Sequence, residues 1–163
     1  MSQAELLELL QTSEFFRGFA EEHLRSVSEI CQLEEFPARS TVFEEYERAR
    51  KVYVILSGEI SLAICETDEV CKHIADVHAG ELMGWSPLVG RARLYDTARA
   101  QTPVTALVFD GDVLMEFCAK NPAFGFRFMH QVACTLAERL SGTRLQLLEM
   151  CGVHLTEFPL ESD

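Results

Sequence analysis

Residues 80–100 carry side chains whose types and spacing could bind a small anion. The stretch begins with Gly80 and Glu81 and contains two closely spaced arginines, Arg91 and Arg93. Glycine lets a backbone approach an anion, and free N–H groups at a short helix start can bind it. Arginine adds a bidentate fork that suits phosphate, and a glutamate can accept hydrogen bonds from sugar hydroxyls. The pattern therefore indicates a site for a phosphorylated, sugar-containing ligand.

The composition restricts the partners that the chain can have. Its 163 residues fit one domain, and 48% hydrophobic with 25% charged residues is typical of a globular chain. A formal net charge of −12 repels nucleic-acid phosphates and anionic membrane surfaces. An anionic ligand therefore needs a locally positive pocket.

The N-terminus has no basic and apolar signal-peptide pattern, and no apolar run is long enough to span a bilayer. We therefore expect a cytoplasmic protein with reduced thiols that behave as small apolar side chains. Its six cysteines form no Cys-x-x-Cys pair, and Cys65, Cys71, His73 and His78 match no standard zinc spacing. No metal site is predicted.

Apolar periodicity divides the chain into helices, strands and helices again. Residues 1–32 read as short helices, with a capping box at their start, and residues 33–110 read as strands. Helices return over 111–151, and 152–163 form a short acidic tail that we expect to be frayed. Many short strands at close spacing predict a mainly β fold, an antiparallel jelly-roll barrel with flanking helices. The expected strands are 34–36, 40–44, 51–57, 59–66, 70–77, 97–101 and 104–109.

The last helix, expected over about 122–150, carries an apolar stripe at alternating spacings of three and four. This spacing is typical of the seam of a two-stranded coiled coil. The alternative is that the stripe packs on the chain's own barrel. We favour a homodimer formed through this helix. The stripe consists of Ala133, Leu136, Leu140, Thr143, Leu147 and Met150.

Three stretches make the chain resemble the cyclic nucleotide-binding domain, specifically the sensor half of the Crp/Fnr-type bacterial regulators. Residues 43–60 look like the family's second hairpin and its Gly-Glu turn, and residues 80–82 look like the start of its phosphate-binding cassette. Residues 121–122 and 137–143 are similar to the entry and middle of its dimerising helix. The resemblance extends from about residue 15 to residue 150 and implies a β-barrel with a long C-terminal helix.

The resemblance implies that cAMP or cGMP is the ligand and that no other cofactor is needed. Gly80 and Glu81, with Leu82 next to them, match the pair that contacts the ribose. The family's Arg-x-Ala-Ser/Thr pattern ends here at Thr97, with candidate phosphate ligands earlier in the cassette. Thr143 matches a helix threonine that contacts the base, although it fits equally well as a small seam residue.

The chain also departs from the family pattern. The position of the phosphate-binding arginine falls on Leu94 and that of the alanine on Asp96. Arg93, one residue earlier, becomes the preferred phosphate partner, with Arg91 as the other candidate. Tyr46 stands where the hairpin glycine normally lies. The lone Trp85 could stack on a base, but packing is the more usual role of such a residue.

Two functions follow from the resemblance. The first is a non-enzymatic regulatory module that binds a cyclic nucleotide or related small anion and signals through a dimer helix to an unidentified protein. The second is a dimeric protein-interaction module whose pocket no longer binds a ligand.

Other classes have less support. A cupin-type enzyme needs His-x-His and Glu metal ligands, and a haem or redox sensor needs ligating Cys or His residues in a recognisable pattern. None of these patterns is present in the sequence. Crp/Fnr-type regulators continue past the long helix into a winged helix-turn-helix, so we expect no direct DNA binding by this stretch.

Overall fold

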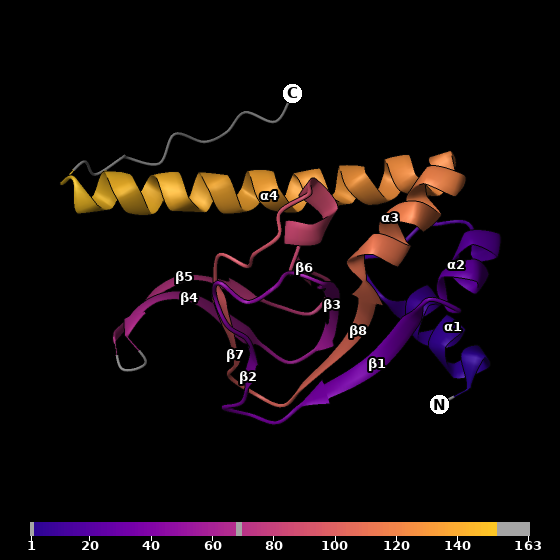
Figure 1. The fold of residues 1–163 in the computed structure, drawn as a ribbon, viewed down its shortest axis with the longest axis horizontal. Coiled ribbons are helices and arrows are strands. Elements are labelled where there is room, and N and C mark those ends of the chain that lie inside the picture. The colour runs from indigo at the N-terminus through magenta and orange to yellow at the C-terminus, as the bar shows by residue number, and fades with distance from the viewer. Residues whose placement is uncertain (1, 68–69, 153–163) are drawn as a thin grey trace.

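The computed structural model describes residues 2–67 and 70–152, and these form a β-barrel flanked by helices (Figure 1). The helices α1, α2 and α3 gather at one end of the barrel, and the long helix α4 lies along its side (Figure 1). The helices are α1 (Gln3–Thr12), α2 (Glu21–Val27), the 3-10 helix η1 (Ser86–Val89), α3 (Gly111–Lys120) and α4 (Pro122–Met150). The strands are β1 (Cys31–Phe36), β2 (Thr41–Phe43), β3 (Lys51–Ser57), β4 (Ile60–Thr67), β5 (Val70–Val77), β6 (Leu82–Met83), β7 (Thr97–Ala100) and β8 (Val104–Asp110).

The strands form two antiparallel four-stranded sheets, in the orders β1-β8-β3-β6 and β2-β7-β4-β5. Strands that are distant in sequence pair within each sheet, as Cys31 of β1 does with Phe109 of β8. This arrangement confirms the predicted mainly β jelly-roll fold with its long C-terminal helix.

The first sheet is buried on both faces, which explains the continuous apolar run in β3. Val52 and Val54 point toward the helices, whereas Tyr53 and Ile55 point into the barrel. Because successive side chains of a strand point to opposite faces, one strand joins two cores. The barrel core lies between the sheets, and the second core lies between the first sheet and the helices.

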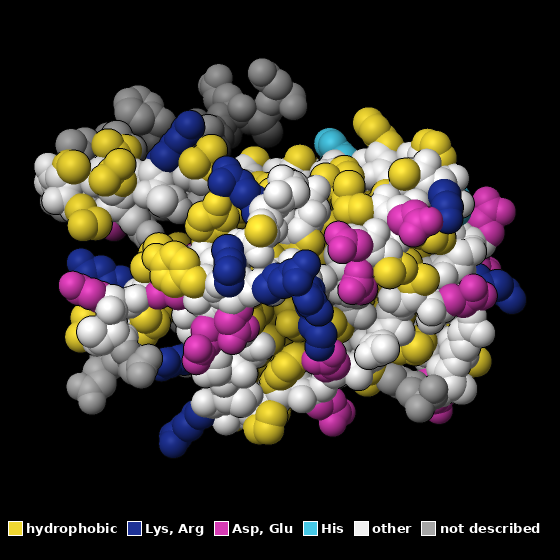
Figure 2. Space-filling view, viewed as in Figure 1, with side chains coloured by type: hydrophobic (Ala, Val, Ile, Leu, Met, Phe, Trp, Pro, Cys, Tyr) yellow, Lys and Arg dark blue, Asp and Glu magenta, His cyan; other side chains and the backbone are white. Residues whose placement is uncertain are grey.

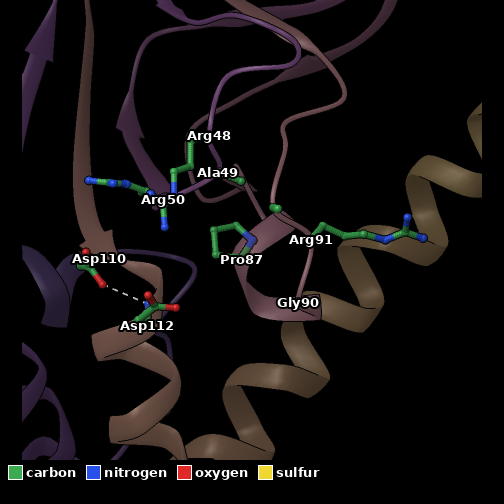
Figure 3. Close-up of a pocket in the computed structure, with 9 residues that line it drawn as sticks. Arg48, Ala49, Arg50, Pro87, Gly90, Arg91, Asp110 and Asp112 are labelled. Carbon is green, nitrogen blue, oxygen red and sulfur yellow. Dashed lines mark hydrogen bonds between the residues drawn. The ribbon is translucent and has the colours of Figure 1, made fainter.

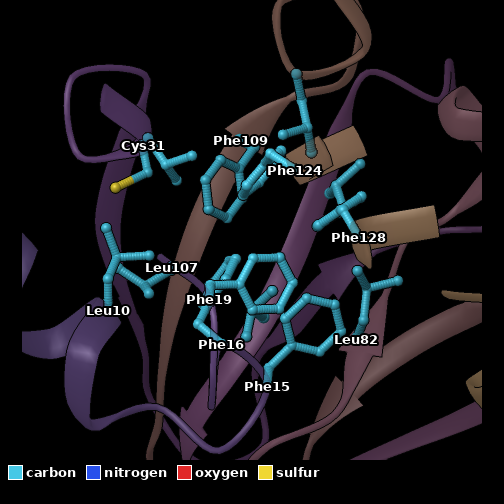
Figure 4. Packing of buried hydrophobic residues seen from close by; sticks show 14 of the residues in the cluster. Leu10, Phe15, Phe16, Phe19, Cys31, Leu82, Leu107, Phe109, Phe124 and Phe128 are labelled. Carbon is cyan, nitrogen blue, oxygen red and sulfur yellow. The ribbon is translucent and has the colours of Figure 1, made fainter. Parts of the chain in front are cut away.

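The core beneath the helices is built mainly from phenylalanines (Figure 4). Phe15 and Phe128 meet edge to face with ring centroids 5.6 Å apart, and Phe124 and Phe128 stack at 5.7 Å. Aromatic pairs at such distances contribute about 0.5–1.5 kcal/mol beyond their buried area. These contacts attach the N-terminal segment to α4, which fixes the start of α4 against the barrel.

Most predicted boundaries agree with the structure to within a few residues. The bounds of β3, β5 and α4 match, and the capping box at Ser2 is present, with Ser2 and Glu5 bonded reciprocally. The helix predicted over 20–31 is too long, because α2 ends at Val27 and Cys31 already pairs in β1. Its apolar residues at 30 and 31 belong to the turn and the strand.

The two halves of α4 differ in their surroundings. Its first half packs on the chain's own core through Phe124, Phe128 and Val132, which are all buried. Its second half leaves Leu140 and other apolar side chains exposed. The predicted acidic tail lies, from residue 153 on, outside the described residues. Exposed apolar residues of the second half are Leu140, Leu145, Leu147 and Met150.

The prediction of six reduced cysteines is wrong for one pair. Cys65 and Cys71 face each other across β4 and β5 and form a disulfide. The sequence reasoning considered only Cys-x-x-Cys spacing, whereas antiparallel pairing brings together two cysteines six positions apart. Cys31 and Cys118 remain free and buried, and burial raises the pKa of each thiol to about 11.

Candidate functional site

The first residues of the predicted cassette form a turn that satisfies its own hydrogen bonds. The N–H of Gly80 donates to the Ile55 carbonyl at 2.9 Å, and the N–H of Glu81 donates to the His78 carbonyl at 3.1 Å. One carboxylate oxygen of Glu81 accepts the N–H of His78 at 2.6 Å. Glu81 therefore caps a backbone turn in this structure. Leu82 continues into β6, where it pairs with Val54 and is fully buried.

The two cassette arginines lie on the outer surface of the barrel. Arg93 donates to the backbone carbonyl of Tyr46 at 2.9 Å. Arg91 donates to the hydroxyl of Tyr95 at 2.6 Å, and its guanidinium carbon lies 5.5 Å from the centre of that ring. Both side chains are exposed. Gly80, Glu81 and the two arginines are therefore not gathered around one hollow.

The two predicted threonines also make internal bonds. Thr97 is 4% exposed, and its hydroxyl oxygen accepts the N–H of Glu45 at 3.2 Å. The hydroxyl of Thr143 donates to the Arg139 carbonyl one turn earlier in α4, at 2.9 Å. Thr143 is exposed, so only Thr97 is built into the barrel wall.

A pocket does lie between α4 and the cassette, at the place where the family resemblance puts the ligand, but it is nearly closed. Its open volume is about 10 Å³. Small-molecule pockets are roughly 300–1,000 Å³, and one water needs about 10–15 Å³. The space is filled by side chains that include Trp85, Leu94, Asp96 and Arg139.

Leu94 closes the pocket from the barrel side. It is 7% exposed and belongs to the barrel core. Its backbone is fixed by the hairpin loop between β2 and β3, since its N–H donates to the Glu47 carbonyl and its carbonyl accepts from Tyr46. An apolar side chain in this position cannot bind a phosphate.

Arg139 closes the pocket from the α4 side. Its Nη2 donates to the Leu82 carbonyl at 2.5 Å, which joins α4 to β6. Burial lowers the pKa of Arg139, while the nearby carboxylates of Glu81 and Asp96 raise it. Burial raises the pKa of Asp96, Arg139 opposes that rise, and Glu45 adds to it. The positive charge in the pocket is thus supplied by the protein itself and faces two of its own carboxylates.

Sequence reasoning did not include Arg139 among the site residues. A signal for it existed, because Arg139 precedes Thr143 by four positions and residues at that spacing share a helix face. Leu94 was recognised only as a mismatch to the family pattern. Its role as a core residue depends on the direction in which the loop enters the barrel, which the sequence pattern did not give. Trp85 packs against the core beneath the helices, in agreement with the packing alternative.

Tyr46 has a backbone φ of 66°, in the left-handed region that glycine occupies freely. The departure from the family glycine therefore leaves the turn unchanged while adding a conformational cost of about 1–2 kcal/mol. Its side chain is 71% exposed, so no buried contact of the side chain offsets that cost.

Two searches for other kinds of site were negative within the described part of the chain. Residues 2–67 and 70–152 hold no group of three or more His, Cys, Asp or Glu side chains arranged to bind a metal. Among the same residues, no helix combines the length and the apolar character needed to cross a membrane.

Comparison with known proteins identifies the family. Residues 33–121 match the cyclic nucleotide-binding domain, and the chain belongs to that family. It is 27% identical over 128 residues to the HTH-type transcriptional regulator Cmr of Mycobacterium tuberculosis, covering 78% of this chain and 50% of the relative. It is 26% identical over 149 residues to the CRP-like cAMP-activated global transcriptional regulator of the same species, covering 88% and 62%. The chain thus spans about half to three fifths of the length of these relatives.

Solved structures support the fold. A cyclic nucleotide-binding domain from Methylobacillus flagellatus superposes with a TM-score of 0.74 at 21% identity, covering 96% of this chain and 86% of that one. The catabolite activator protein of Thermus thermophilus superposes with a TM-score of 0.68 at 22% identity, covering 85% and 63%.

Proposed function

We propose that this chain is a non-enzymatic, dimeric regulatory module whose nucleotide pocket is held closed by its own side chains. The observation that carries the proposal is the open volume of about 10 Å³ between α4 and the cassette. Arg139 occupies that space as an internal cation, and Leu94 replaces the arginine that the family pattern requires for the phosphate. The two changes act together, because one removes the phosphate ligand and the other fills the space it served.

The second half of α4 supports the dimeric part of the proposal. Leu140 is 53% exposed and Leu147 is 60% exposed, and both belong to the heptad-like stripe. Exposed apolar side chains in a coiled-coil pattern are buried when two such helices pair. Two copies joined through α4 would present a single surface to a partner, and regulation would act through partner binding.

Cyclic nucleotide sensing is a second candidate, and family membership favours it. It requires α4 to move away from the cassette so that Arg139 leaves the pocket. It also requires a phosphate partner, and Arg91 and Arg93 would have to exchange their present bonds to Tyr95 and Tyr46 for it.

Calorimetric titration and thermal unfolding with cAMP, cGMP and cyclic dinucleotides at millimolar concentration separate the two candidates. A ligand present at 100 times its Kd stabilises a protein by about 2.7 kcal/mol, which for a domain of this size raises the Tm by several degrees. We expect no saturable heat and no rise in Tm. Saturable binding with a micromolar Kd would refute the closed pocket and establish the sensor.

A further inference from the structure

The hairpin loop before β3 and the segment after η1 bring five cations together on the outer face of the barrel. They are Arg48, Arg50, Lys51, Arg91 and Arg93, out of 14 lysines and arginines in a chain with a net charge of −12. Arg48 and Arg93 lie opposite each other in a β-bridge. Figure 2 shows Lys and Arg side chains gathered near the middle of one face, with carboxylates around them.

The four arginines have no acidic partner within the described residues. Lys51 pairs with Glu34 at 2.6 Å, but no carboxylate of residues 2–67 or 70–152 lies within 4.0 Å of a guanidinium of the four. All four side chains are exposed. A concentrated positive field on an acidic molecule is suited to binding a negatively charged partner.

Two hollows share Arg48 and Arg50, and we call them together the arginine groove. The first, of about 440 Å³, is also lined by Arg91, Asp110 and Asp112 (Figure 3). The side chain of Arg91 extends away from Pro87 toward α4, so it forms the rim of this hollow (Figure 3).

The second hollow, of about 290 Å³, has an apolar floor. Its floor includes Val42, Phe43 and Leu94, and Tyr53 borders it. Burial, with the nearby charges of Glu34 and Glu47, raises the pKa of Tyr53 to about 12, so its hydroxyl keeps its proton at neutral pH. The groove thus combines arginines with an apolar recess large enough for one aromatic or aliphatic side chain.

The carboxylates in the first hollow restrict the chemistry of the occupant. One oxygen of Asp110 accepts the N–H groups of Asp112 and Val113 at 3.0 and 3.1 Å and so caps α3. Asp112 adds a second negative charge. A compact polyanion such as free phosphate would meet these carboxylates as well as the arginines. An extended peptide can separate its carboxylates from them and direct backbone N–H groups toward the aspartates.

We propose that the arginine groove binds an extended acidic peptide segment of a partner protein, with acidic side chains on Arg48 and Arg50 and an apolar side chain in the recess over Val42 and Phe43. The site is separate from the closed pocket, since it lies on the outer side of the cassette and shares only Phe43 and Leu94 with it. The proposal therefore does not depend on whether a nucleotide binds.

Fluorescence anisotropy with a fluorescein-labelled eight-residue peptide tests the proposal. The probe carries a central phenylalanine flanked on each side by two glutamates, and a control probe carries glutamines instead. We expect saturable binding of the acidic probe that weakens at least tenfold in the Arg48→Gln/Arg50→Gln variant, at least tenfold in 0.5 M salt, and severalfold when the phenylalanine is replaced by alanine.

The matched control protein is Arg17→Gln/Arg25→Gln, which loses the same charge on exposed residues near the N-terminus that lie outside the groove. It should bind the acidic probe as the unsubstituted protein does. Circular dichroism should show both variants folded, since all four arginines are exposed. The proposal fails if the acidic probe does not bind at millimolar protein, if the two double variants bind it equally, or if inorganic phosphate binds the groove while the peptide does not.

Discussion

The Arg139 guanidinium on α4 donates to the backbone carbonyl of Leu82, 57 positions earlier in the chain, at 2.5 Å. This bond joins the long helix to the first residue of the cassette strand. It also places a positive charge where the family resemblance predicts a nucleotide. The relationship between α4 and the cassette thus depends on a side chain of the protein itself.

Replacing Arg139 with methionine keeps the length of the side chain but removes its charge and its donors. The Leu82 carbonyl loses a charged hydrogen bond, which contributes roughly 1.5–3 kcal/mol, and Asp96 loses its positive neighbour. We expect the free energy of unfolding, measured in urea, to fall by about that amount. Arg144→Met, at an exposed position of the same helix, should change it by less than about 0.5 kcal/mol. Equal effects of the two changes would mean that the Arg139 bond contributes nothing.

Asp96 should make stability depend on pH. Its pKa is raised in the folded protein, chiefly by burial, so the folded state binds more protons than the unfolded state between the unfolded pKa of about 3.8 and the raised folded value. The contribution of Asp96 to stability therefore decreases as pH rises through this window.

Asp96→Asn removes this titration. Urea unfolding from pH 3 to 7 should show the stability of the variant, relative to the unsubstituted protein, increasing with pH and then levelling off. A difference that is constant over this range, or that changes in the opposite direction, would contradict the raised pKa.

Thr97 and Thr102 form a matched pair. Each hydroxyl oxygen accepts a backbone N–H, from Glu45 at 3.2 Å and from Glu59 at 3.0 Å respectively, but Thr97 is buried and Thr102 is exposed. Replacement by valine leaves a buried N–H unsatisfied only in the first case. We expect a loss of about 1–3 kcal/mol for Thr97→Val and clearly less for Thr102→Val. Equal losses in thermal or urea unfolding would show that burial of this bond is unimportant.

The disulfide between Cys65 and Cys71 closes a short loop at the tip of β4 and β5. In the chain-entropy description, a loop of this length stabilises the folded state by about 2 kcal/mol. Unfolding in urea with and without reductant should show that difference, and Cys65→Ser/Cys71→Ser should be insensitive to reductant. If the oxidised protein reacts at these positions with a thiol-alkylating reagent, the pairing is wrong.

Pairing through α4 predicts a difference between two faces of the helix. Leu147→Glu places a charge in the predicted seam and should convert a dimer to a monomer in light scattering. Leu145→Glu introduces the same charge at a residue that is 51% exposed but lies outside the seam, and it should leave the dimer intact. A monomeric unsubstituted protein would remove the dimer from the proposed function.

The sequence by itself determined the architecture and the family. Apolar runs with period two predicted the strands, the pattern from Pro122 to Met150 predicted the length of α4, and the capping box predicted the start of α1. These signals are local or periodic, so one chain read in order contains them.

Only the tertiary structure decided what lies in the pocket. Leu94 enters the barrel core and Arg139 reaches the Leu82 carbonyl because chain segments far apart in sequence pack together, and no spacing rule gives that direction. The same reason applies to the disulfide, which depends on the register of β4 against β5. The arginines at 91 and 93 were recognised from sequence as a positive cluster, but the face on which they lie is set by the path of the loop between η1 and β7.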